Sequence, residues 1–147
     1  MALRIFCDFD GTIVHQDVGD TFFRSFGGDQ AVGAIEGYRT GRLHAKECLA
    51  TAVSSVGHVR RDEFERFVDQ FSVDQTFGAF LAWAESQGAS VTVVSDGLDL
   101  YVERILSSSG FSQLTVRANS GEFDPSTDTG LSVSFPWQDE VCEECAN

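Results

Sequence analysis

The residues with the clearest chemical potential are two aspartates, Asp8 and Asp10, followed at once by Gly11 and Thr12. A carboxylate nucleophile beside a second carboxylate that can shuttle a proton suits phosphoryl transfer through an aspartyl phosphate. Two carboxylates this close repel each other unless a cation sits between them. Gly11 permits a turn in which its amide can approach an anion, and Thr12 adds a hydroxyl. Because such tetrapeptides are also common in solvated loops, this motif alone does not decide the function.

A second polar cluster, Ser95-Asp96-Gly97, follows an apolar run later in the chain. If Gly97 opens the next helix, the Ser95 hydroxyl and the amides of that helix would form an anion site. The alternative is that Ser95 and Asp96 only cap a helix beginning near Leu98. The two roles are compatible, so the cluster adds a candidate phosphate site to the two aspartates.

Both clusters end apolar segments that have the pattern of buried strands. Leu3–Cys7 runs directly into Asp8, and the β-branched run Ala89–Val94 runs into Ser95. Such runs are typical of strands buried on both faces of a parallel sheet. Ligands of open α/β sheets bind at the carboxyl ends of the strands. We therefore expect Asp8 and Ser95 at one sheet edge, within reach of a single phosphate.

The remaining segments alternate between helical and strand patterns. Leu98–Leu106 has helical spacing, and Leu114–Ala118 has the pattern of a third strand. The alternation of Leu131, Val133 and Phe135 indicates a hairpin arm. This order predicts an α/β fold, a Rossmann-like parallel sheet with right-handed crossovers.

Residues 15–74, between the first two strands, contain only helical stripes of apolar side chains, which we interpret as core. The stretch is too long for a simple crossover. We therefore expect an inserted all-helical cap at 15–74 and an α/β core formed by 1–14 and 75–147.

Charge restricts the partners that the chain can take. Ten basic residues against 23 acidic ones give a net charge of −13. This field repels nucleic acid and anionic membrane surfaces, so we expect neither as a partner. It also opposes a phosphate ester, so a bound divalent cation would have to supply local positive charge.

The hydrophobic pattern and the cysteine positions indicate where the protein is located and whether it has a zinc site. No apolar run approaches the roughly 20 residues of a membrane span. Cys7, Cys48, Cys142 and Cys145 are spread unlike a secreted disulfide framework, which predicts a cytoplasmic protein. Cys142 and Cys145 alone are half of a structural zinc site, so we expect no zinc there.

The motif Asp8-Phe9-Asp10-Gly11-Thr12 resembles the first motif of the haloacid dehalogenase superfamily, and Ser95 resembles its second. The helical insertion resembles the cap of the phosphoserine-phosphatase-like branch. The stretches Gly37–Leu43, Glu47–Leu49 and Ser95–Tyr101 are most similar to the methionine-salvage phosphatases, which act on a methylthio-ketopentenyl phosphate. The resemblance implies a magnesium-dependent phosphomonoesterase of a small phosphorylated metabolite.

The resemblance also implies roles for particular residues. Asp8 is similar to the family nucleophile and magnesium ligand, and Asp10 to the general acid/base, whose backbone carbonyl also binds the metal. The phosphate cradle corresponds to Gly11, Thr12, Ser95, Asp96 and Gly97.

Three further residues are candidate substrate contacts. Asp17 stands where phosphoserine-specific relatives have a Glu, and its shorter side chain disfavours phosphoserine. Arg39 and Arg42 in the cap are candidates too, although solvated helix charges are the preferred interpretation.

Two motifs of the family are missing from this chain. The family uses a third-motif Lys and a later acidic pair, but the only Lys is Lys46, inside the cap. We therefore expect a C-terminally truncated piece of a longer protein. The alternatives are a remnant that binds phosphate without catalysis, and a phosphotransferase using the same intermediate. We also expect Leu3–Cys7 to have an open edge that self-associates or captures the Cys142–Asn147 tail or the hairpin arm.

Overall fold

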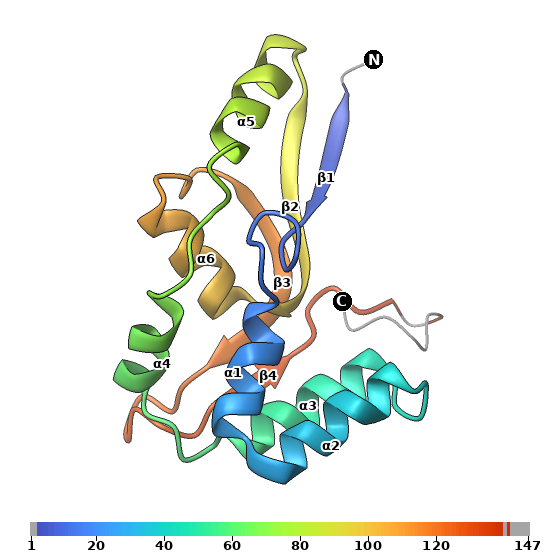
Figure 1. Ribbon diagram of the computed structural model, residues 1–147, viewed down its shortest axis with the longest axis vertical. Coiled ribbons are helices and arrows are strands. Elements are labelled where there is room, and N and C mark those ends of the chain that lie inside the picture. Colours follow the sequence, from blue (N-terminus) through green and yellow to red (C-terminus); the bar gives the residue numbers. More distant parts are fainter. Residues whose placement is uncertain (1–2, 140, 142–147) are drawn as a thin grey trace.

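The computed structural model describes residues 3–139 and 141 and shows a sheet with helices and a helical lobe at one end (Figure 1). Its elements, in chain order, are β1 (Arg4–Asp8), α1 (Val18–Phe26), α2 (Gly28–Arg39), α3 (Ala45–Ser55), α4 (Arg61–Val68), α5 (Phe77–Ser86), β2 (Ser90–Leu98), α6 (Asp99–Ser108), β3 (Thr115–Glu122) and β4 (Ser132–Ser134). The α/β class predicted from the sequence is confirmed.

The sheet has the order β1-β2-β3-β4. β1 and β2 are parallel, as are β2 and β3, while β4 runs antiparallel to β3. Asp8 is paired with Val94, the residue before Ser95. The expectation that Asp8 and Ser95 share one sheet edge is therefore confirmed.

The boundaries around the second polar cluster differ from our expectation. β2 continues through Ser95, Asp96 and Gly97 to Leu98, and α6 begins only at Asp99 with Leu98 as its N-cap. The prediction that Gly97 opens this helix, or that Ser95 and Asp96 cap it, is wrong. The pairing of β2 with β3 shifts register after Val94 and resumes where Leu98 faces Asn119, so the strand continues where the pattern indicated a turn.

The third strand is also longer than expected, and it provides one arm of the hairpin itself. β3 extends to Glu122, where Ser120–Glu122 pairs with β4. The hairpin arm is thus bound to β3, and our alternative that it covers β1 is wrong. The Cys142–Asn147 tail lies outside the described residues.

The described helices of the core lie on one side of the sheet. α5 and α6 pack against β2, and α6 also against β3 (Figure 1). Val93 of β2 is completely buried, whereas Phe6 of β1 is 65% exposed. No helix of the described residues has the length and apolar composition needed to cross a bilayer.

The helical insertion is built around phenylalanine. The Phe22 ring lies 5.0 Å from the Phe64 ring and 5.5 Å from the Phe67 ring, centroid to centroid, which joins α1 to α4. At the base, the Asp74 amide donates to the Ile13 carbonyl over 2.8 Å. The start and end of the insertion therefore lie side by side where they leave the core.

The hairpin also packs on the insertion. The Arg61 guanidinium lies 2.7 Å from the Asp128 carboxylate, and the Phe64 and Phe123 ring centroids are 5.5 Å apart. Residues after the second strand thus help to hold the helical insertion in place. The domain boundaries at 15–74 and 75–147 stay a prediction.

We expect Phe22→Ala to destabilise the fold strongly. Phe22 is 1% exposed and contacts several other rings, so truncation leaves a cavity in the centre of the insertion. Such a change costs about 3 to 5 kcal/mol in the free energy of unfolding, measured by urea denaturation. The matched control is Trp83→Ala on α5, where the side chain is 52% exposed; it should cost less than roughly 1 kcal/mol. Equal losses would contradict this assignment of the core.

Candidate active site

The loop after β1 is wound around one carbonyl group. The Phe9 carbonyl accepts the amides of Thr12, Ile13 and Val14 at 3.2, 2.9 and 3.1 Å. Phe9 is fully buried, which anchors the loop in the core. Gly11 has a φ of 74°, in the left-handed region that favours glycine. The sequence Asp-Gly-Thr can therefore turn sharply at the end of the strand and keep Asp8 and Asp10 together.

Both oxygens of the Asp10 carboxylate are engaged. Oδ1 accepts the Val18 amide at 2.7 Å, and Oδ2 accepts the Tyr101 hydroxyl at 2.9 Å. Burial raises the pKa of Asp10 to about 7, and the charges of Asp17 and Asp96 add to the rise, against the two hydrogen bonds. A carboxyl group with this pKa can both give and take a proton near neutral pH.

Four carboxylates line one cavity at the carboxyl ends of the strands. Its lining consists of Asp8, Asp10, Asp17, Val94, Ser95 and Asp96. Burial raises the pKa of Asp96, and the nearby charges of Asp17 and Asp8 raise it further. No arginine or lysine of the described residues lines this acidic cavity, so it repels an anion unless a cation supplies positive charge.

The groups expected to bind phosphate make internal hydrogen bonds. The Gly97 amide donates to Ser95 Oγ at 3.1 Å, and the Gly11 amide donates to the Gln16 carbonyl at 3.4 Å. The Thr12 hydroxyl donates to Asp8 Oδ2 at 3.3 Å. Ser95 and Asp96 line the acidic cavity, whereas Gly11 and Thr12 do not. Thr12 thus contacts Asp8 from the side of the loop.

A second cavity, here called the cap cavity, joins the acidic cavity through Asp10, Asp17 and Asp96. It lies between the end of the sheet and the helices α1, α2 and α3. Its apolar lining includes Phe23, Ile35, Tyr38, Leu49 and Ala52.

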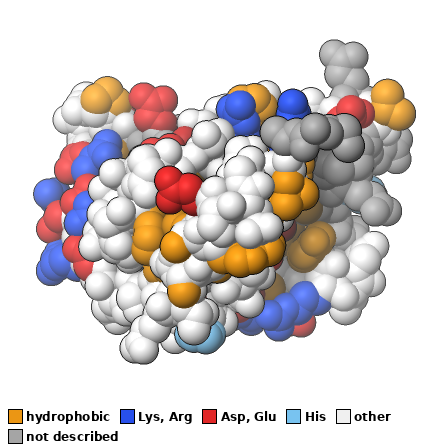
Figure 2. All heavy atoms as spheres, turned by 90° about the horizontal axis from the view of Figure 1, so that it is seen from above, with side chains coloured by type: hydrophobic (Ala, Val, Ile, Leu, Met, Phe, Trp, Pro, Cys, Tyr) orange, Lys and Arg blue, Asp and Glu red, His pale blue; other side chains and the backbone are white. Residues whose placement is uncertain are grey.

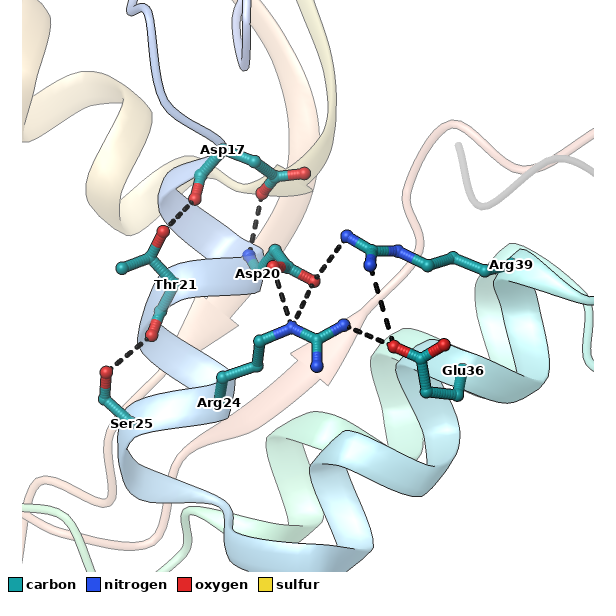
Figure 3. Close-up of polar contacts among 7 residues, drawn as sticks. All are labelled: Asp17, Asp20, Thr21, Arg24, Ser25, Glu36 and Arg39. Atoms are coloured by element: carbon teal, nitrogen blue, oxygen red, sulfur yellow. Dashed lines mark hydrogen bonds and ion pairs between the residues drawn. The ribbon is translucent and has the colours of Figure 1, made fainter.

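A network of charges borders the cap cavity (Figure 3). Arg24 bridges Asp20 and Glu36, with ion pairs of 2.9 and 2.8 Å. Arg39 reaches the same two carboxylates at 3.5 and 3.6 Å. Asp20 and Arg39 both line the cap cavity, so Arg39 is the basic side chain closest to the site in the described lining.

Of the other two predicted substrate contacts, the structure places one at the cavities and one away from them. Asp17 lines both cavities, and its side chain accepts the Asp20 amide at 2.7 Å as the N-cap of α1. Arg42 instead donates to the Thr40 hydroxyl and lines neither cavity. Arg42 is exposed to solvent, but it lies in the loop between α2 and α3, so the expectation that it stands on a helix is wrong.

Two residues of the site were missed from the sequence. Tyr101 is buried, lines the cap cavity and binds Asp10. Asn119 is completely buried, and its Nδ2 donates to the Asp96 carbonyl at 2.8 Å. The available signals were a Tyr hydroxyl within the apolar stripe of α6 and an Asn amide within a strand. Neither signal predicts which group the side chain will bind, because Asp10 and Asp96 lie far from Tyr101 and Asn119 in the chain.

The donor set suits a hard cation only in part. In the portion of the chain that the structure describes, no three His, Cys, Asp or Glu side chains form a metal-binding group. Mg²⁺ takes oxygen ligands, keeps several waters and often binds only one or two carboxylates. The oxygen-rich acidic cavity fits that behaviour and does not fit a closed zinc site. Cys142 and Cys145 lie outside the described residues.

Comparisons with known proteins give one consistent result. Residues 5–132 match the family described as haloacid dehalogenase-like hydrolase. The chain is 23% identical over 146 residues to a 2-hydroxy-3-keto-5-methylthiopentenyl-1-phosphate phosphatase of Brevibacillus brevis, covering 99% of this chain and 64% of that protein. It is 26% identical over 152 residues to the phosphatase of the same name from Exiguobacterium sibiricum, and the match covers 100% of this chain and 65% of that protein.

A solved structure of a substrate-bound phosphoserine phosphatase is similar in fold. The TM-score is 0.71 at 19% identity, covering 90% of this chain and 63% of that one. The chain therefore spans somewhat less than two thirds of the length of these relatives.

We expect Asp10→Asn to remove a pH dependence of stability. The folded-state pKa of about 7 lies above the ordinary value of about 3.9, so between these values the folded chain holds a proton that the unfolded chain releases. This group's contribution to the free energy of unfolding therefore falls as pH rises from about 4 to about 7. Urea denaturation without divalent cations should show wild type losing stability relative to the variant across that range.

Asp69→Asn is the control of opposite sign. Its hydrogen bond to Arg104 lowers the pKa of Asp69, so that stabilisation is present above about pH 3.9 and lost only as pH falls further. The difference between wild type and this variant should be flat between about pH 4 and 7. A flat difference for Asp10→Asn as well would contradict the raised pKa.

Proposed function

Because this chain belongs to the haloacid dehalogenase-like hydrolases, we propose that it acts on a small organic phosphate monoester through an aspartyl phosphate on Asp8. The observation that carries this proposal is the gathering of Asp8, Asp10, Ser95 and Asp96 in one cavity at the carboxyl ends of parallel strands. Ligands of such sheets bind at this edge.

The proposed reaction uses Asp8 as the nucleophile and Asp10 as the acid and then the base. An Asp8 carboxylate oxygen attacks phosphorus, the bond from phosphorus to the ester oxygen breaks, and Asp10 gives its proton to the departing alcohol. Asp10 then takes a proton from water, which attacks phosphorus and breaks the bond to Asp8, releasing phosphate. A pKa of about 7 supports both halves, because each protonation state of Asp10 is populated near neutral pH.

Hydrogen bonds keep these groups in place. The Val18 amide and the Tyr101 hydroxyl hold the two oxygens of Asp10, and the Thr12 hydroxyl contacts Asp8. Ser95 is buried and lines the same cavity, so its hydroxyl would contact a phosphate bound there. In this proposal Gly97 supports the site by fixing the Ser95 hydroxyl through its amide.

A magnesium ion is part of the proposal because the cavity is acidic. Asp8 and the backbone carbonyl of Asp10 would hold it, with water and phosphate oxygens completing its shell. When bound, Mg²⁺ would neutralise the phosphate and permit its approach to Asp8.

We propose that the alcohol part of the substrate occupies the cap cavity. That cavity measures about 160 Å³, and its lining from α1, α2 and α3 is mainly apolar, with Asp20 and Arg39 also part of it. A protein cavity of roughly this size accepts one benzene-sized group. The similar phosphatases are named for a methylthiopentenyl phosphate, an ester with a short apolar end.

The test is to trap the phosphorylated chain. We expect incubation with Mg²⁺ and acetyl phosphate, followed by acid quenching, to add one phosphoryl group to the peptide that contains Asp8. Asp8→Asn should abolish the addition, because an amide is a poor nucleophile. Asp10→Asn should increase its accumulation, because acetyl phosphate has a good leaving group whereas hydrolysis needs the base. Addition of phosphate to Asp8→Asn would overturn the assignment.

We expect only slow turnover by this chain. Its one lysine, Lys46, donates to Gln138 at 2.6 Å and lies over the Phe135 ring, and it does not line the acidic cavity. Loss of one electrostatic element at an active site costs about 100- to 1,000-fold in rate. Phosphate release from an aryl phosphate should therefore stay far below about 10 per second, the median of enzymes. Turnover near that rate would contradict the expectation.

The lack of a lysine in the described lining of the acidic cavity favours a second candidate function, a module that binds phosphate without hydrolysing its esters. Equilibrium dialysis with radiolabelled inorganic phosphate and Mg²⁺ distinguishes the two. Binding without phosphorylation of Asp8 would support the module, and phosphorylation of Asp8 would support the hydrolase.

A further inference from the structure

The side chain of Tyr101 is buried against the acid/base candidate of the site. Its hydroxyl donates to Asp10 Oδ2 at 2.9 Å, and the residue is only 2% exposed although it lines the cap cavity. A buried tyrosine hydroxyl needs a hydrogen-bond partner. Here that partner is the carboxyl group that moves a proton in both steps of the proposed reaction.

Two glycines leave the space that the Tyr101 hydroxyl occupies, here called the hydroxyl slot. A Cβ atom at Gly97 would overlap the hydroxyl oxygen, and a Cβ atom at Gly19 would lie 3.1 Å from it. Neither glycine has a positive φ, so the backbone at both positions suits other residues as well. The structure therefore uses the missing side chains of Gly19 and Gly97, which permit a close approach of Tyr101.

The aromatic ring of Tyr101 is held as well. Its centroid lies 6.1 Å from that of Phe9, which is fully buried. The start of α6, which carries Tyr101, is tied to β3, because Asp99 Oδ1 accepts the Gly121 amide at 2.8 Å. The Tyr101 hydroxyl thus meets Asp10 from a position fixed by the core.

A hydroxyl can do more for Asp10 than its other partner can. The Val18 amide lies 2.7 Å from Oδ1 and can only donate, whereas a tyrosine hydroxyl can donate or accept. Tyr101 donates to Oδ2 when that oxygen carries no proton, and it can accept from Oδ2 when it does. Contact between the two side chains can therefore persist while Asp10 first gives and then takes a proton.

We propose that Tyr101 is a positioning residue that holds the Asp10 carboxyl at one orientation through both steps, in a slot that Gly19 and Gly97 keep open. This role rests on the function proposed above. Without the hydroxyl, Asp10 would be held at Oδ1 alone and could rotate, so the oxygen that takes a proton from water would lose its aim. Gly97, expected from the sequence to belong to the phosphate cradle, has this second purpose.

The test separates the two steps of the reaction. Acetate is a good leaving group, so phosphorylation of Asp8 by acetyl phosphate with Mg²⁺ needs little help from Asp10. Tyr101→Phe should leave that rate nearly unchanged. It should slow the later hydrolysis of the aspartyl phosphate by about 10- to 100-fold, the effect of losing one hydrogen bond to a charged group. Hydrolysis is followed by removing acetyl phosphate and measuring, by mass spectrometry, the phosphoryl group left on the Asp8 peptide.

Gly19→Ala tests the hydroxyl slot itself. In wild type the added methyl group would press on the Tyr101 hydroxyl, and hydrolysis should slow. In Tyr101→Phe the same methyl group would have only ordinary contacts, at 3.7 Å, with the ring Cε1 and with Asp17 Oδ1. Gly19→Ala should therefore have no further effect in that background. Equal effects of Gly19→Ala in both backgrounds would contradict the slot, because independent sites are additive.

Ser86→Ala is the control for loss of a hydroxyl. Ser86 Oγ donates to the Trp83 carbonyl at 2.6 Å near the end of α5. This helix lies at the end of the molecule that faces the viewer in Figure 2, and the carboxyl ends of the parallel strands lie away from it (Figure 1). Both rates should match those of wild type, and circular dichroism checks that every variant is folded.

The outcomes separate this inference from the proposed function. A wild type that takes up no phosphoryl group would overturn both. A phosphorylated wild type whose hydrolysis is unaltered by Tyr101→Phe would overturn the role of Tyr101 alone. Equal slowing of phosphorylation and hydrolysis in Tyr101→Phe would also overturn it, because that result indicates a general disturbance of the site.

Discussion

The structure depends on one half-buried carboxylate, that of Asp10. Asp10 receives the Val18 amide on one oxygen and the Tyr101 hydroxyl on the other. These donors belong to the first helix of the insertion and to the helix after the second strand, so a single side chain joins the loop, the insertion and the core. Burying a carboxylate is costly unless it is hydrogen-bonded or takes up a proton. The raised pKa of Asp10 reflects that cost, and it is also the property that proton transfer at this site would use.

The charges around Asp10 make a site that cannot work on an anion alone. Asp8, Asp17 and Asp96 share its cavity, in a chain that already carries a charge of −13. Arg39, the basic side chain in the described lining of the cap cavity, is itself ion-paired with Asp20 and Glu36, which Arg24 also bridges. A bound cation is therefore the simplest way to reconcile this cavity with a phosphate ester.

The helical insertion is held from two directions. Its ends meet at Asp74 and Ile13, while Arg61 and Phe64 attach its far side to the hairpin after β3. The cap cavity between these parts is consequently formed by packed elements. The sheet is less evenly covered, because α5 and α6 lie on one side (Figure 1) and the edge of β1 is open among the described residues.

The sequence by itself determined the local features: the strand before Asp8, the strand before Ser95, the helical insertion between them and the common sheet edge on which both clusters lie. The elements follow from hydrophobic period, which is a short-range signal, and the common edge follows from the order of strands and helices along the chain. Only the tertiary structure decided that Gly97 stays in β2, because β2 pairs with β3 again at Leu98 and Asn119, beyond the register shift. Tertiary packing likewise decided that Tyr101 binds Asp10 and that Asn119 holds the Asp96 carbonyl. These contacts join residues far apart in the chain, and no local pattern specifies which distant group a buried hydroxyl or amide will meet.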